Sequence, residues 1–203
     1  YNPATGWLAG WRSRDGQLHD HGFLFVNGMA ISFGLIEGEQ AKEVLRRLEA
    51  ARIAAGHTDF RHGLMVQLWP VPSCDLASSA QNSLFGRGWR IGLRPDGLDT
   101  FGVFCNGCLT PFLAGFYVRA LSMHGFTETA DRICDQLLES YERGLFDGDR
   151  NGAEYFTHEG IPCGYEGSLI HSHPTLARSP STRAGSNRSN RSGGPVSRPA
   201  SED

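Results

Sequence analysis

The residues best suited to chemistry are two glutamates set among aromatic residues near the end of the apolar part of the chain. Glu154 is followed by Tyr155 and Phe156, and Glu166 follows Tyr165. Hydrolysis of a glycosidic bond uses two carboxyl groups, one as a general acid and the other as a base or nucleophile. A carboxyl group among aromatic side chains can have a raised pKa, which suits a proton donor. The alternative for Glu166 is a first-turn position in a helix, where its charge interacts with the helix dipole.

Two motifs raise the question of a metal site, and neither has a full set of ligands. The stretch DGDRNG, residues 147–152, begins like a calcium-binding loop, but His158 stands where that loop needs a bidentate Glu. Turn formation explains the Asp, Asn and Gly residues of this stretch. Cys105 and Cys108 have CxxC spacing, but no second pair of zinc ligands follows at matching spacing. We therefore expect no metal and no cofactor, and we interpret the two thiols as apolar groups on a buried helix.

Acids, histidines and tryptophans also gather near the N-terminus. His19 and His21 flank Asp20, and the same segment contains Asp15 and two tryptophans. Such mixtures are typical of sugar-binding surfaces, because a flat aromatic ring can stack on the apolar face of a sugar while polar groups bind its hydroxyls. Exposed turn residues are the alternative interpretation, and the sequence favours neither.

The elements that would position these residues are predicted to be helices. Apolar and amphipathic stretches alternate in two pairs, and the second member of each pair has apolar residues at helical spacing. The predicted helices lie within residues 22–36, 37–56, 106–125 and 127–144. FVNG at 25–28 and FCNG at 104–107 each open the first helix of a pair, which indicates an internal repeat of helical hairpins. An ordinary helical bundle is the alternative.

A long connection joins the two pairs, from about His57 to Val103. It is rich in Gly, Pro, Ser and aromatic residues, among them Trp69, Phe85 and Trp89. Loops of this length are uncommon unless they are functional or disordered, and large aromatic residues argue against disorder. We therefore expect a folded loop that lines a site.

Composition limits the partners and the compartment. The chain has 203 residues and a net charge of −3, so no overall positive charge favours nucleic acid or an anionic membrane as a partner. No apolar run approaches the roughly 20 residues of a membrane span. The five cysteines are odd in number and unevenly spaced, which favours a reduced, cytoplasmic compartment over a disulfide framework.

The chain divides into two regions of different composition. Residues 1–170 carry the apolar patterns and are predicted to form one domain, which begins without a Met and therefore reads as part of a longer protein. Residues 171–203 are Ser, Arg and Pro with almost nothing apolar, so we expect a disordered tail. A shifted reading frame would produce the same abrupt change.

Several stretches together resemble the C-terminal part of a six-hairpin, (α/α)6-barrel glycosidase, the architecture of glucoamylases and processing α-glucosidases. They are GWRSRDGQLHD, FLFVNGMAISFGL, FCNGCLTPFLAGFYVRALSMHGFTETADRI and NGAEYFTHEGIPCGYEG. The resemblance implies an all-α fold. Because far fewer helices are recognisable than a closed ring needs, we expect a partial (α/α)6 toroid of helical hairpins with long loops.

The resemblance also implies roles for individual residues. Glu154 matches the position of the family's general base, which activates water, and Glu166 is the second choice for this role. Asp15 and Asp20 are the candidates for the general acid, in a Trp-containing loop where Arg12 stands in place of an acid. The residues expected to line the sugar subsites are Trp11, Trp69, Trp89 and Tyr155.

The expected function is therefore hydrolysis of a glycosidic bond with inversion, acting on an oligosaccharide or glycoside. A sugar phosphorylase of the same fold, which uses inorganic phosphate in place of water, is one alternative. A non-catalytic helical repeat module that binds glycan or protein is the other. For that module, the acidic residues named above would not share a cleft.

Overall fold

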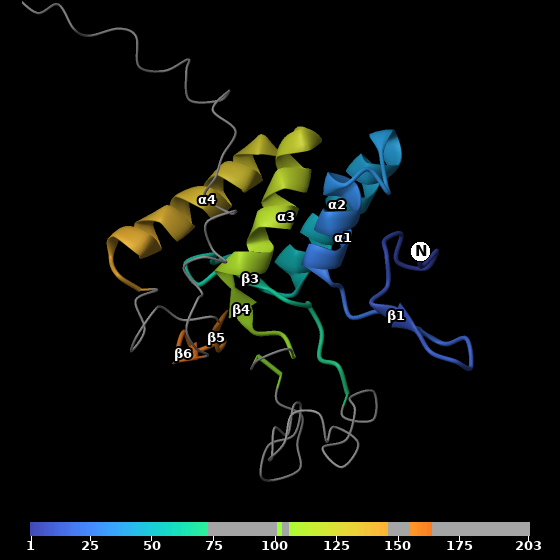
Figure 1. The fold of residues 1–203 in the computed structure, drawn as a ribbon, viewed down its shortest axis with the longest axis horizontal. Coiled ribbons are helices and arrows are strands. Elements are labelled where there is room, and N and C mark those ends of the chain that lie inside the picture. Colours follow the sequence, from blue (N-terminus) through green and yellow to red (C-terminus); the bar gives the residue numbers. More distant parts are fainter. Residues whose placement is uncertain (73–100, 103–105, 146–154, 164–203) are drawn as a thin grey trace, which may run out of the picture.

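The computed structural model describes residues 1–72, 101–102, 106–145 and 155–163. This part of the chain forms helices in two consecutive pairs (Figure 1). They are α1 (Leu24–Ser32), α2 (Gly38–Ala54), α3 (Pro111–Met123) and α4 (Thr127–Glu142). The positions of the helices predicted from apolar spacing are confirmed, with shorter ends. In the described residues, no helix combines the length and apolar composition that crossing a membrane would take.

Short strands accompany the helices. A hairpin pairs β1 (Trp11–Arg12) with β2 (Leu18–His19). The second sheet is antiparallel and has the order β3-β4-β5-β6. Its strands are β3 (Leu64–Met65), β4 (Leu109–Thr110), β5 (Tyr155–Phe156) and β6 (Pro162–Cys163).

The prediction of an all-α fold, a partial toroid of helical hairpins, is therefore wrong. About 45% of the described chain is helical and about 11% is in strands, which makes the fold mixed. The third predicted helix also begins later than the sequence predicts. Leu109 and Thr110 are extended and pair with β3, and α3 begins at Pro111, which fits a first helical turn because it has no N–H to leave unpaired.

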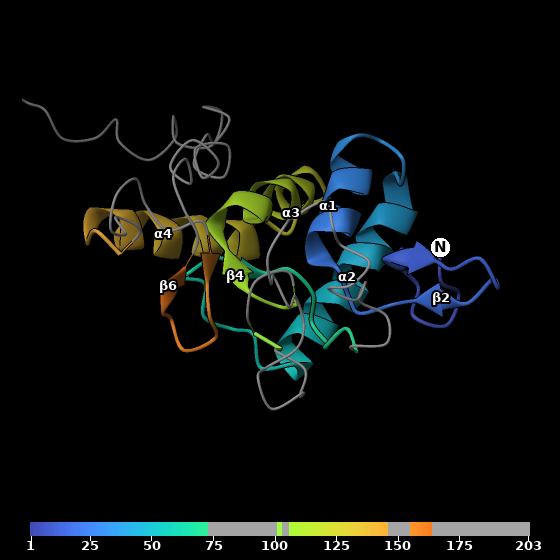
Figure 2. The ribbon, with the colours of Figure 1, turned by 60° about the horizontal axis from the view of Figure 1, so that its bottom comes forward.

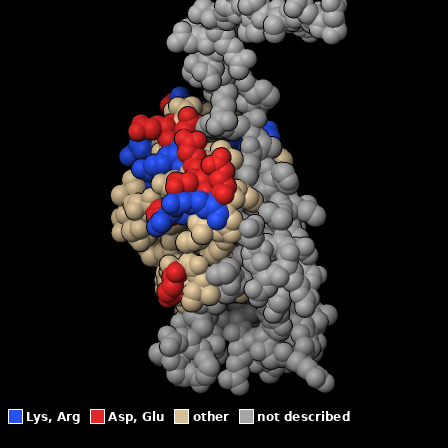
Figure 3. All heavy atoms as spheres, turned by 90° about the vertical axis from the view of Figure 1, so that its left-hand side faces the viewer, with Lys and Arg blue, Asp and Glu red and all other residues tan. Residues whose placement is uncertain are grey.

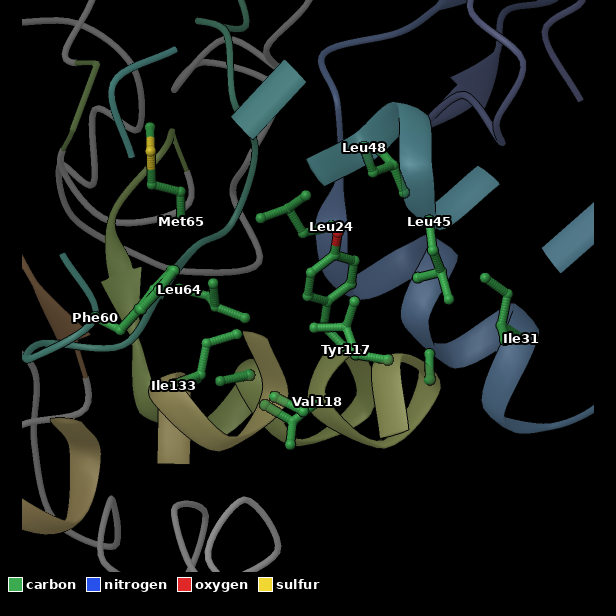
Figure 4. Close-up of a cluster of buried hydrophobic side chains, with 14 of the residues drawn as sticks. Leu24, Ile31, Leu45, Leu48, Phe60, Leu64, Met65, Tyr117, Val118 and Ile133 are labelled. Carbon is green, nitrogen blue, oxygen red and sulfur yellow. The ribbon is translucent and has the colours of Figure 1, made fainter. Parts of the chain in front are cut away.

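The two first helices, α1 and α3, pack directly against each other. A Cβ on Gly28 would lie 2.7 Å from the Cα of Tyr117, so only glycine allows this approach of the two backbones. Ser32 Oγ donates a hydrogen bond to the Phe116 carbonyl across the same interface, at 2.9 Å. Tyr117 projects from α3 into the middle of the buried apolar cluster (Figure 4). This close contact fixes α1 and α3 relative to each other at the centre of the core.

The second helix of each pair covers the core with one face. On α4, Ala130, Ile133 and Leu137 are completely buried, as helical spacing predicts. The opposite face of α4 carries exposed charges of both signs, and Arg143 pairs with Glu139 at 3.3 Å. Figure 3, which views the side where α4 lies in Figure 1, shows acidic and basic side chains in alternation.

A buried ion pair ties α2 to the rest of the core. Arg52 Nη2 donates to Glu49 Oε2 at 2.6 Å, and its Nε donates to Glu49 Oε1 at 3.0 Å. Tyr117 of α3 donates its hydroxyl to Glu49 Oε1 at 2.9 Å. Burial, followed by the charge of Glu49, raises the pKa of Tyr117 well above its ordinary value, so the hydroxyl keeps its proton. The remaining nitrogen of Arg52, Nη1, donates to the His57 carbonyl.

His57 continues this buried polar chain towards the sheet. Its Nε2 accepts a hydrogen bond from the Met65 backbone N–H in β3, at 3.2 Å, and its ring packs edge-on against Phe60. Burial, together with the nearby Arg52 charge, lowers the pKa of His57 to about 3. The neutral imidazole therefore holds the strand.

We expect Arg52→Met to lower the free energy of unfolding by about 3 to 5 kcal/mol, because the substitution leaves Glu49 buried without its cation. Urea denaturation followed by far-UV circular dichroism measures the change. Arg46→Met is the matched control, since Arg46 lies on the same helix in an exposed pair with Glu43. The control should leave the midpoint nearly unchanged. Equal losses for both variants would contradict the role of the buried pair.

His57 predicts a pH dependence of stability. Because its folded pKa of about 3 lies below the ordinary value of 6.5, the unfolded chain takes up the proton first as the pH falls. The contribution of His57 to the free energy of unfolding is thus complete above about pH 6.5. It decreases towards pH 3, with a slope of up to about 1.4 kcal/mol per pH unit. Urea midpoints at several pH values compare the wild type with His57→Gln. The prediction fails if the difference between the two proteins does not vary between pH 6.5 and 4.5.

Candidate functional site

The β1–β2 hairpin brings together residues that the sequence placed on a possible sugar-binding surface. Trp11 and His19 face each other across the two strands. Their rings stack with centroids 4.8 Å apart and planes inclined by 7°. The ring of His21 lies 5.6 Å from that of Trp11. One local hairpin therefore gathers three flat side chains.

Asp15 lies at the turn of this hairpin and is exposed. Its carboxylate accepts hydrogen bonds from the Ser13 hydroxyl and from the Gln17 backbone N–H, the latter at 3.1 Å. These two hydrogen bonds, the first more than the second, lower the pKa of Asp15. Gly16, with φ of +91°, completes the turn in a conformation that glycine adopts readily. The geometry gives Asp15 a part in closing the turn, and its role as a general acid stays a prediction.

Asp20 is the centre of the hydrogen bonds in the N-terminal segment. Its Oδ2 accepts from Asn2 Nδ2 and Thr5 Oγ1, both at 2.7 Å. Its Oδ1 accepts from Trp7 Nε1 at 2.8 Å and from the Gly22 backbone N–H at 3.2 Å. Four donors use the whole acceptor capacity of a carboxylate. This arrangement anchors residues 2–7 to the hairpin, and proton donation by Asp20 stays a prediction.

Trp69 reaches the same place from the connection that follows α2. Its backbone N–H donates to the His21 carbonyl at 3.1 Å. Its ring covers Gly22, where an added Cβ would lie 2.7 Å from the indole. The indoles of Trp69 and Trp7 stack with centroids 6.2 Å apart and planes inclined by 19°. At Trp69 this connection folds back onto the segment that follows β2, and its role in lining a site stays a prediction.

We call Trp7, Trp11, His19, His21 and Trp69 the aromatic surface. Trp11 and Trp69 are 36% and 39% exposed, whereas Trp7 is buried. Trp11 and Trp69 are thus partly exposed while their backbones are hydrogen-bonded, which suits a flat, partly apolar ligand with polar groups at its edge.

Tyr155, a further predicted sugar-binding residue, lies elsewhere. It belongs to β5, and its neighbour Phe156 packs against His62 with ring centroids 4.7 Å apart. Figures 1 and 2 show the β1–β2 hairpin and the β5–β6 hairpin on opposite sides of α3. The structure thus brings together Trp11, Asp20 and Trp69, with Asp15 on the same hairpin, and keeps Tyr155 apart from them.

Several predicted residues lie outside the described part of the chain. These are Glu154, Glu166, Trp89 and Cys105, together with the loop 147–152 and the tail 171–203. Their predicted roles stay predictions. Cys108 is buried just before β4, outside any helix. Within the described ranges, no three His, Cys, Asp or Glu side chains are grouped so that they could hold a metal ion.

Trp7 is the member of the surface that sequence reasoning did not single out. Its contribution depends on Asp20 and Trp69, which lie 13 and 62 positions away, so no local pattern reports it. The one signal available was its place in the segment already rich in acids and aromatic residues.

No family model, no curated protein and no solved structure matches this chain. The function is therefore inferred from the residues and their geometry.

Asp20→Asn should lower the free energy of unfolding by about 1.5 to 3 kcal/mol, because an amide NH₂ would face groups that are themselves donors. Urea denaturation followed by tryptophan fluorescence measures this, since Trp7 donates to the replaced group. Asp15→Asn is the control on the same hairpin and should shift the midpoint far less. Equal shifts would contradict the anchoring role of Asp20.

Proposed function

We propose that this chain is part of a carbohydrate-active enzyme that hydrolyses a glycosidic bond, and that the aromatic surface binds its oligosaccharide or glycoside substrate. The observation that carries the proposal is the pair of exposed indoles, Trp11 and Trp69, fixed around His21 beside a carboxylate that holds the surrounding backbone. The sequence motifs that resemble those of glycosidases also support this proposal, whereas the all-α fold that the same resemblance implies is wrong.

The chemistry of a sugar matches this surface. The C–H groups on one side of a pyranose ring form an apolar patch that an indole face can cover, while the hydroxyls at the edge need hydrogen-bond partners. His19 and His21 lie against Trp11, where their rings support the indole. Because Trp11 stacks on His19 and Trp69 stacks on Trp7, little conformational entropy is lost when a ligand stacks on the exposed indoles.

In the proposed reaction, Glu154 acts as the general base that activates water. A general acid works best when its pKa lies near the working pH. Asp15 has a lowered pKa, and Asp20 already accepts four hydrogen bonds. We propose Glu154 as the base, and Asp15 and Asp20 stay the candidates for the general acid.

Binding and hydrolysis of gluco-oligosaccharides test the proposal. Trp11→Ala and Trp69→Ala should each weaken binding about 3- to 10-fold, measured by calorimetry with maltotriose and cellotriose. Phe33→Ala is the matched control, since Phe33 is an exposed aromatic residue outside the aromatic surface. Glu154→Gln should reduce hydrolysis by about 10²- to 10⁴-fold while binding is retained. Undiminished binding in both Trp variants, or full hydrolysis by Glu154→Gln, would refute the proposal.

A further inference from the structure

The repeated motifs FVNG and FCNG carry two asparagines that make the same contact. Asn27 Oδ1 accepts the Leu8 backbone N–H at 2.8 Å, and its Nδ2 donates to the Leu8 carbonyl at 3.1 Å. Asn106 Oδ1 accepts the Val71 backbone N–H at 2.9 Å, and its Nδ2 donates to the Val71 carbonyl at 3.2 Å. Both asparagines are completely buried. Each side-chain amide therefore pairs with one residue of the main chain as a neighbouring strand would.

Each residue whose backbone N–H and C=O are bound by an asparagine, which we call gripped, lies just after a tryptophan of the aromatic surface. Leu8 follows Trp7 directly, and Val71 comes two positions after Trp69. The two indoles stack on each other at 6.2 Å, so the two gripped segments meet at this contact. The asparagines thus hold the ends of both segments from inside the core, while the tryptophans project from them.

The orientation of the Asn106 amide follows from its neighbours. Its Oδ1 accepts from Gln67 Nε2 at 2.9 Å in addition to the Val71 N–H. Turning the amide over would place its NH₂ against both of these donors. Gln67 is itself completely buried, and its Oε1 has no hydrogen-bond partner in the part of the chain that the structure describes. Gln67 thus adds one bond to Asn106, whereas Val71 is gripped at both its N–H and its C=O.

We propose that Asn106 is a positioning residue of the aromatic surface: it sets Trp69 against Trp7 by gripping Val71, and Asn27 does the same for Trp7 through Leu8. The proposal depends on the sugar-binding function proposed above. Neither asparagine needs to touch the sugar. Each asparagine places an indole. That indole either touches the sugar or supports the indole that touches it.

Asn106→Asp tests this with almost no change of side-chain volume. The aspartate can still accept from Val71 N–H, but it cannot donate to the Val71 carbonyl and places a second oxygen against it. We expect weaker exciton coupling between Trp7 and Trp69 in the circular dichroism spectrum, and binding of maltotriose or cellotriose weakened about 3- to 10-fold. Gln67→Met is the matched control, because it removes a bond to Asn106 but leaves both bonds to Val71. It should retain the exciton signal and the affinity.

A double-mutant cycle with Trp69→Ala separates positioning from general destabilisation. If Asn106 acts through Trp69, Asn106→Asp will have little further effect on binding once the indole is absent. An equal loss of affinity in both backgrounds would overturn the proposal. Asn106→Ser, which keeps a hydroxyl near Val71, takes the place of Asn106→Asp in the same cycle if the aspartate variant does not fold.

The outcomes for the two proposals are distinguishable. If the wild type binds the sugars and Asn106→Asp binds them equally well with an unchanged exciton signal, the positioning role is refuted and the sugar-binding function stands. If the wild type binds no sugar, the proposed function fails, and the exciton signal alone then decides whether Asn106 places Trp69 against Trp7. An unchanged signal in that case refutes the positioning role as well.

Discussion

The buried pair of Glu49 and Arg52 is the constraint on which the other contacts depend. Two charges removed from water must satisfy each other and nearly all their remaining hydrogen-bonding groups, or the fold loses several kcal/mol. Here the missing partners come from different segments: the Tyr117 hydroxyl from α3 and the His57 carbonyl from the connection after α2. Arg52 also lies over the Phe60 ring at 4.9 Å. The pair therefore sets where the chain leaves α2 and turns towards β3 and Trp69.

The helices were predictable because their signal is local, whereas the strands were not. Apolar residues at helical spacing and a glycine past the end of α2 report on neighbours within a few positions. Each described strand has only two residues, and the pairing of Leu64 with Thr110 joins segments 46 positions apart. Such short strands have no alternation to detect, so the sequence favoured an all-α fold. What decided the outcome was long-range pairing, on which local propensity has little bearing.

The candidate site likewise has a part that local sequence predicts and a part that depends on distant segments. Trp11, His19, Asp20 and His21 lie within one hairpin, and their grouping could be expected from the sequence. The stacking of Trp7 on Trp69 depends on contacts between distant segments. Roles were harder to predict than positions, because a residue type does not reveal what surrounds it. The sequence predicts Asp20 as a candidate acid, and only the donors that surround it reveal that it also anchors the chain that precedes it.

The two repeated motifs, FVNG and FCNG, share a side-chain contact but not a local backbone conformation. Asn27 lies inside α1, whereas Asn106 precedes β4, so the two motifs differ in local conformation. What they share is an amide whose C=O and NH₂ match the N–H and C=O of one peptide unit. A buried amide without such partners would cost about 1 to 3 kcal/mol, so each asparagine needs a backbone segment beside it. The hydrogen bonds that satisfy each asparagine also bring a tryptophan-bearing segment to the core. Core stability and the geometry of the aromatic surface therefore depend on the same hydrogen bonds.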